Sequence, residues 1–118
     1  MDRITYKIDN LSKDSLISKG FKYNRNLYEP SDEVYTYRFP LMFYNKITVI
    51  ECIINVFIET GLVNISVINS NTRELYAPFY DREYGEYYNI KIIDNKLNKK
   101  LKELGIKKIW KWLLHQNV

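Results

Sequence analysis

VYTYRFPLMFYNKITVIECIINVFIE, residues 34–59, carries apolar side chains at alternate positions on both sides of Asn45-Lys46. Before this pair the alternating residues are Tyr35, Tyr37, Phe39, Leu41 and Phe43, and after it they are Ile50, Cys52, Ile54, Val56 and Ile58. A period of two is typical of a β-strand with one buried face. A two-residue turn at Asn45-Lys46 places Leu41 opposite Ile50, Phe39 opposite Cys52 and Tyr37 opposite Ile54. Both apolar sets then share one face, which predicts an antiparallel hairpin.

The pattern continues on the C-terminal side of this hairpin. A turn at Thr60-Gly61, where glycine accepts a positive φ, pairs Ile58 with Val63, Val56 with Ile65 and Ile54 with Val67. A three-residue loop at 70–72 would bring Leu75, Ala77 and Phe79 to the same face. We therefore predict a four-stranded antiparallel meander with strands at 34–44, 47–59, 62–69 and 73–79. Pro40 and Pro78 cannot donate to a ladder, so each marks an edge strand or a bulge.

An amphipathic helix is predicted to cover the apolar face of this sheet. Its stripe recurs at helical spacing over residues 90–104, with Asn89 as a possible N-cap and Gly105 as the stop, and it consists of Ile90, Ile93, Leu97, Leu101 and Leu104. A second short helix is expected at 107–115, with Ile106, Ile109, Trp110, Leu113 and Leu114 facing inward. At the N-terminus we expect a strand at 4–8, which could extend the meander, and a short helix at 12–19 closed by Gly20. The prediction is one α+β domain spanning residues 1–118.

Composition limits the class of protein. The chain has 118 residues, 46% hydrophobic and 15% aromatic, which is too apolar for a disordered chain and long enough for a core without metal or disulfides. Its longest uncharged apolar run is too short to cross a bilayer, so no membrane association is expected. The charged N-terminus lacks the apolar segment of a secretion signal, and a single cysteine fits a reducing compartment. We expect a cytoplasmic protein.

Groups able to perform catalysis are few. The only histidine, His115, lies near the chain end without a partner nearby, and Cys52 falls on the predicted buried face, where a thiol behaves as a small hydrophobe. One cysteine and one histidine cannot build a zinc site. Asp81, Glu83 and Glu86 lie in a polar loop without a pocket that would raise a pKa. The sequence therefore favours a protein that is not an enzyme and holds no cofactor or metal.

The first candidate contact surface is a tyrosine-rich segment at 76–88. Tyrosine and arginine concentrate at interface anchors because they give large, rigid contact areas. The alternative is that these rings only cover the edge of the core. The predicted partner-binding residues are Tyr76, Tyr80, Arg82, Tyr84, Tyr87 and Tyr88.

The second candidate surface is basic. Residues 91–118 hold eight lysines against Asp94 and Glu103, although the whole chain has a formal charge of only +4. Lysines on one helix face can neutralise phosphates, and a nearby ring can stack on a base. A basic amphipathic helix can also lie on an anionic membrane, and the remaining alternative is an ordinary solvated helix face. The predicted nucleic-acid-binding residues are Lys96, Lys99, Lys100, Lys107, Lys108, Lys111 and Trp112.

Three segments together resemble small uncharacterised accessory proteins carried by phages and mobile elements of low-GC Gram-positive bacteria. They are YTYRFPLMFYNKITVIECIINVFIETGLVNISVI (35–68), LYAPFYDREYG (75–85) and LKELGIKK (101–108). Proteins of this kind are often non-enzymatic, anti-CRISPR-like inhibitors that bind a host defence complex or sequester its nucleotide signal. The resemblance therefore implies a host-defence inhibitor acting in the host cytoplasm on a host protein or nucleoprotein complex. A nonspecific nucleic-acid-binding protein using the basic C-terminal helix is the alternative, and exposed edge strands leave a homodimer open.

Overall fold

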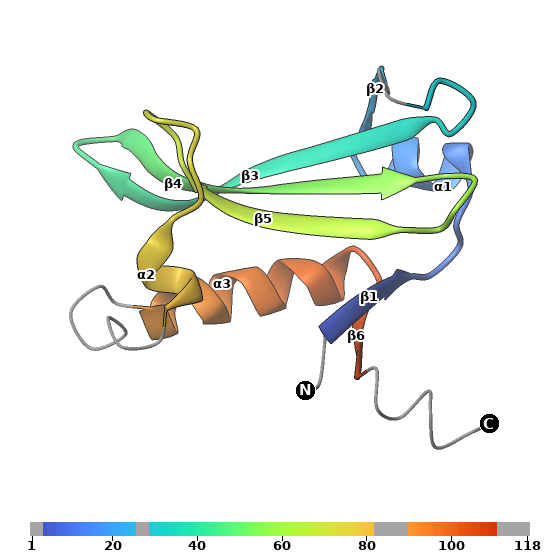
Figure 1. Ribbon diagram of the computed structural model, residues 1–118. Coiled ribbons are helices and arrows are strands. Elements are labelled where there is room, and N and C mark those ends of the chain that lie inside the picture. Colours follow the sequence, from blue (N-terminus) through green and yellow to red (C-terminus); the bar gives the residue numbers. More distant parts are fainter. Residues whose placement is uncertain (1–3, 26–28, 82–89, 111–118) are drawn as a thin grey trace.

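The computed structural model describes residues 4–25, 29–81 and 90–110. A four-stranded antiparallel sheet forms one layer, and a long helix packs across one of its faces as the second layer (Figure 1). A separate two-stranded sheet lies at the C-terminal end of that helix. The predicted α+β class, with a four-stranded antiparallel sheet and a C-terminal helix, is confirmed. The elements are β1 (Ile4–Ile8), α1 (Lys13–Ser18), β2 (Lys22–Asn24), β3 (Val34–Tyr44), β4 (Ile47–Phe57), β5 (Val63–Asn69), α2 (Ala77–Tyr80), α3 (Ile90–Glu103) and β6 (Ile106–Trp110).

The β3–β4 hairpin follows the predicted register over most of its length. Tyr37 pairs with Ile54 and Phe39 with Cys52, and the turn consists of Asn45 and Lys46, with φ of 49° and 66°. The predicted pairing of Leu41 with Ile50 is wrong, because a bulge after Pro40 makes Met42 the partner of Ile50. Leu41 is nevertheless fully buried. Pro40 predicted either an edge strand or a bulge, and a bulge follows it in the structure.

The β4–β5 register differs from the prediction by two residues. Val56 pairs with Val63 and Cys52 with Val67, so residues 58–62 form a longer loop than Thr60-Gly61. The buried Asp32 carboxylate explains this loop, because it accepts hydrogen bonds from the Glu59 N–H (2.7 Å) and the Thr60 hydroxyl (3.0 Å). A shift of two keeps every side chain on its predicted face.

The fourth strand of the sheet is not the predicted one. Residues 73–79 contribute only an isolated bridge between Ile68 and Leu75, after which the chain enters α2 with Pro78 in the first turn. The Asn69 side chain accepts hydrogen bonds from the amides of residues 71 and 72, which turns the chain away from the sheet. The fourth strand is instead β2, which pairs with β3, so the strand order is β2-β3-β4-β5.

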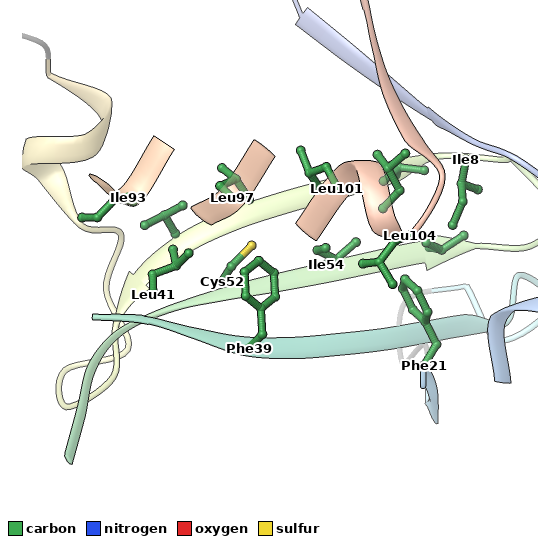
Figure 2. Close-up of a cluster of buried hydrophobic side chains, with 14 of the residues drawn as sticks. Ile8, Phe21, Phe39, Leu41, Cys52, Ile54, Ile93, Leu97, Leu101 and Leu104 are labelled. Atoms are coloured by element: carbon green, nitrogen blue, oxygen red, sulfur yellow. The ribbon is translucent and has the colours of Figure 1, made fainter. Parts of the chain in front are cut away.

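Helix α3 buries the predicted stripe against the sheet (Figure 2). Gly105, with φ of 74°, follows the helix as predicted, whereas Asn89 lies outside the described residues. The five residues of the stripe, all at most 5% exposed, are Ile90, Ile93, Leu97, Leu101 and Leu104. They meet side chains of the sheet that include Phe39, Leu41, Cys52 and Ile54.

The predicted helix at 107–115 is wrong where the structure describes it. Residues 106–110 form β6, which pairs antiparallel with β1, placing Ile8 opposite Ile106. Both isoleucines are buried against the core, and residues 111–118 lie outside the described part of the chain. β1 is a strand as predicted, but it joins β6 rather than the meander. Helix α1 also agrees, with Ser12 capping it and Gly20 following it at φ of 101°.

Candidate functional site

The tyrosine-rich segment has a structural role where it is described. The Tyr80 hydroxyl accepts a hydrogen bond from the Val67 N–H (2.9 Å), and the Tyr76 N–H donates to the Val67 carbonyl (2.9 Å). Burial is the main cause that raises the pKa of Tyr80, although its ring remains 49% exposed. These two residues fasten α2 to the edge of β5. The other predicted partner-binding residues, Arg82, Tyr84, Tyr87 and Tyr88, lie outside the described residues.

The predicted lysines do not share one helix face. Lys96 and Lys100 point toward β3, where Lys96 Nζ donates to the Leu41 carbonyl (3.0 Å) and Lys100 Nζ lies 5.8 Å from the Tyr37 ring centroid. A hydrogen bond to Glu103 is the main cause that raises the pKa of Lys100. Lys99 is exposed on the solvent side of α3.

The remaining predicted lysines belong to a different element. Lys107 and Lys108 lie on β6, with Lys107 Nζ 3.7 Å from Asp9 Oδ2, and Lys111 and Trp112 fall outside the described residues. The prediction of one continuous basic helix face is therefore wrong for these positions, because neighbouring strand residues point to opposite sides.

Two lysines of α3, Lys96 and Lys100, lie along the outer edge of β3. Strand β2 covers only residues 34–36 of this edge, and no described strand pairs with the rest. Phe21, Tyr37 and Phe39 form a row of rings there, with centroids 5.3 and 5.9 Å apart. Gly20 permits this row, because a Cβ at this position would lie 3.1 Å from the Tyr37 ring.

A hollow of about 570 Å³ opens at the first residue of β2, Lys22, which lies opposite Thr36 at the start of the uncovered part of β3. We call it the basic groove. Lys19 at the end of α1, the whole of β2 and the neighbouring residues of β3 supply its walls. It is lined by Lys19, Gly20, Lys22, Tyr23, Asn24, Thr36, Tyr37 and Arg38. Three of these residues are cationic, and none carries a carboxylate.

The positive charge of the groove is only partly neutralised. Lys19 Nζ donates to the Leu104 carbonyl (2.8 Å) and the Asp9 carbonyl (3.2 Å), which satisfies the C-terminal end of α3. Arg38 forms an ion pair with Glu51, which Arg73 also contacts at 3.3 Å. Lys22 is exposed, as are the other two residues of β2. The groove can therefore offer one exposed ammonium and one partly engaged guanidinium to an anion.

A second hollow is lined in part by Asp9, whose carbonyl accepts a hydrogen bond from Lys19 of the basic groove. It has a volume of about 470 Å³ and is formed by the last turns of α3 and by β6. Its lining residues are Asp9, Asn98, Leu101, Lys102, Gly105, Ile106, Lys107 and Lys108. The end of the molecule around the C-terminus of α3 thus carries two neighbouring hollows rich in lysine.

Groups suited to catalysis are not assembled in the described part of the chain. Cys52 is fully buried, and this burial raises the pKa of its thiol to about 12. Asp81 is exposed, whereas Glu83, Glu86 and His115 lie outside the described residues. Across residues 4–25, 29–81 and 90–110, no group of three histidine, cysteine or carboxylate residues could hold a metal ion. The helices of this same part are all too short or too polar to span a membrane.

Sequence reasoning missed most of the basic groove. Residues 21–29 showed no clear periodicity, because β2 has only three residues. The available signal was local: Lys22 and Tyr23 follow the Gly20 stop of a predicted helix, and Arg38 occupies an outward position of a predicted strand. Only the pairing of Lys22 with Thr36 brings these segments together.

Comparison with solved structures shows that this fold has been seen before. The crystal structure of a DUF1831 family protein from Lactobacillus plantarum is similar to this chain, with a TM-score of 0.56 and 13% sequence identity. The match covers 90% of this chain and 88% of that chain. Neither the protein-family models nor the curated proteins gave a match. At this identity the likeness shows the fold alone.

Proposed function

We propose that the protein is a non-enzymatic binding protein that holds nucleic acid in the basic groove. The observation that carries this proposal is the lining of the groove, which combines Lys19, Lys22 and Arg38 with two tyrosines and no carboxylate. Cations that neutralise phosphates release counterions, and this release supplies most of the affinity of nonspecific binding. The buried, protonated Cys52 offers no competing nucleophilic chemistry.

The affinity should depend steeply on salt. Each phosphate neutralised by the protein contributes roughly 0.7 to 0.9 to the slope of log affinity against log salt concentration. Fluorescence anisotropy with a labelled oligonucleotide, repeated over a range of sodium chloride concentrations, measures this slope. Groove binding predicts that the variant Lys22→Glu loses about 10-fold or more in affinity at low salt and that its slope falls by about one or more.

The matched control is Lys91→Glu. Lys91 is exposed like Lys22 but lies in the first turn of α3, whereas Lys19 binds the carbonyl of Leu104, which follows the last turn of this helix. The same charge reversal there should weaken binding far less. Equal losses in both variants would show that net charge rather than the groove attracts the ligand. An absence of binding at low salt would overturn the proposal.

In the setting that the sequence resemblance implies, we propose that this binding serves inhibition of a host defence nucleoprotein complex in the host cytoplasm. Exposed apolar side chains at the β3–β4 hairpin tip favour a protein contact in addition to the groove, since Phe43, Tyr44 and Ile47 are 54%, 70% and 68% exposed. Affinity purification from the natural host, with the Lys22→Glu and Tyr44→Ala variants in parallel, tests this. Recovery of nucleic acid alone, with no protein complex, would contradict the inhibitor role and leave the groove proposal intact.

A further inference from the structure

We infer that the basic groove binds single-stranded nucleic acid in preference to duplex, with the ring of Tyr23 stacking on an unpaired base. This inference rests on the proposed function and specifies its ligand. Stacking on an aromatic ring requires a base whose face is free, which a single strand offers at every position and a duplex offers only at its ends.

Tyr23 is held as a stacking platform would be. Its side chain is 60% exposed, although it lies directly opposite the buried Tyr35 in the β2–β3 pairing. The two rings meet nearly at right angles, at 69° with centroids 5.8 Å apart. An edge contact of this kind fixes the Tyr23 ring while leaving much of it open to solvent.

The groove wraps around the edge of the sheet, which separates its two kinds of side chain. Lys22 pairs with Thr36, so its side chain shares the sheet face of Thr36 and of Arg38 two residues further on, which is the face opposite α3. Tyr23 and Tyr37 belong to the other face, on the side of the helix. A strand laid across this edge can place phosphates near the two cations and a base beside Tyr23.

The space and the polar groups also suit a nucleotide. The volume of about 570 Å³ lies within the usual range of small-ligand sites. The Asn24 side chain amide donates to the Thr36 hydroxyl (3.2 Å), which in turn donates to Asn55 (2.6 Å). Asn24 shares the sheet face of Lys22 and Thr36, and these bonds leave its carbonyl oxygen and one amide proton for the sugar–phosphate part of the strand.

A duplex fits the described surface less well. Proteins that read duplex DNA place a helix or a two-stranded ribbon in its grooves. Here Lys96 and Lys100 of α3 are turned to the sheet edge, where they contact the Leu41 carbonyl and the Tyr37 ring. The projecting β3–β4 ribbon carries one lysine, Lys46, in its turn, and the residues beside this turn, Phe43, Tyr44 and Ile47, are exposed and apolar.

The test compares a fluorescently labelled deoxythymidine oligomer of about 12 nucleotides with the same oligomer in duplex form, by anisotropy at low salt. We expect the single strand to bind about 10-fold more tightly than the duplex. Tyr23→Ala should weaken single-strand binding about 10-fold, whereas Tyr23→Phe, which keeps the ring, should bind like the parent protein. Leu75→Ala serves as the control, because Leu75 is 58% exposed beside β5, at the opposite edge of the sheet from the groove. A shift of the Tyr23 ring resonances on adding the oligomer gives a direct readout of stacking.

The outcomes separate the two proposals. Duplex binding as tight as single-strand binding, or an unchanged affinity in Tyr23→Ala, would overturn the single-strand inference. If Lys22→Glu still weakens binding in that case, the groove remains the nucleic-acid site. Failure of both oligomers to bind at low salt would overturn the proposed function as well.

Discussion

The two outer edges of the sheet are protected in different ways. At β5 the chain closes the edge around Val67 with its own neutral groups. The Val67 N–H donates to the Tyr80 hydroxyl, and the Val67 carbonyl accepts from the Tyr76 N–H. At β3 the edge beyond β2 has no strand beside it among the described residues, and it is guarded by Pro40, by the bulge and by Lys96 on the Leu41 carbonyl. Exposed edges promote pairing with other chains, and proline, bulges and lysine are common protections against it.

This difference explains where a ligand can bind. A backbone edge closed by hydrogen bonds within the chain has no donors or acceptors left for a partner. An edge that carries lysine side chains disfavours pairing with another strand, and the positive charge of these lysines can still attract an anion. The basic groove lies on the lysine-guarded edge, next to the short strand β2.

The largest expected effect concerns the bulge of β3. Leu41 is fully buried beneath α3, although the bulge removes it from the predicted pairing with Ile50. Leu41→Ala should lower the free energy of unfolding by about 2–5 kcal/mol, through lost burial and the cavity it leaves. Urea unfolding followed by far-UV circular dichroism measures this loss.

Ile47→Ala is the control for this substitution. It removes an aliphatic side chain from the same hairpin, but Ile47 is 68% exposed, so its effect should stay within about 0.5 kcal/mol. Similar losses at both positions would mean that burying Leu41 beneath α3 stabilises the fold no more than the exposed Ile47 side chain does.

A smaller effect on stability, with a distinct effect on association, is expected at Lys96. The variant Lys96→Met keeps the apolar stem and removes the ammonium that binds the Leu41 carbonyl, which should cost about 1–2 kcal/mol. Because the edge also loses a positive charge, the variant should self-associate more than the parent protein in sedimentation velocity. Lys99→Met, on the solvent side of the same helix, should remain like the parent protein. Association in both variants would assign the effect to surface hydrophobicity rather than to the edge.

The long strands were predictable because alternating apolar residues over this length are typical of a β-strand and not of a helix. Eleven residues on each side of Asn45-Lys46 alternate, and a turn of two residues brings the apolar sets together, so β3 and β4 required no information from elsewhere in the chain. The α3 stripe was equally informative because it continues over several turns. Even here the exact pairings depended on distant groups, since Asp32 holds residues 59 and 60 in a loop and shifts the β4–β5 register by two.

Short segments failed because their patterns fit more than one structure. Residues 106–110 place isoleucines three apart, which suits a helix, yet their pairing with β1, about a hundred residues away in sequence, makes them a strand. The groove is also a product of distant contacts, since α1, β2 and β3 each supply part of its lining. A local pattern identifies such residues as basic or aromatic but does not bring them together.

The closed edge of β5 allows a milder test. Tyr80→Phe removes the hydroxyl that accepts the Val67 N–H but keeps the ring against Phe79, and it should cost about 1 kcal/mol because water can partly replace the lost partner. Amide exchange at Val67 should become faster, while nucleic-acid affinity should not change, since Tyr80 lies on the edge away from the basic groove. Weaker nucleic-acid binding by this variant would contradict the division of roles between the two edges.

The pH dependence of the same variant gives the smallest and most specific effect. Burial raises the pKa of Tyr80 in the folded state above its ordinary value of 10.0, so its contribution to stability is complete below pH 10 and is lost as the pH rises further. The raised pKa values of Tyr6 and Cys52 act in the same direction in both proteins, so the comparison retains only the titration of Tyr80 and its coupling to these two groups. The free energy of unfolding of Tyr80→Phe should therefore fall less steeply above pH 10 than that of the parent protein. Parallel curves in this range would contradict a raised pKa of Tyr80 in the folded chain, and would mean that the Val67 N–H, whose hydrogen bond lowers this pKa, offsets the effect of burial.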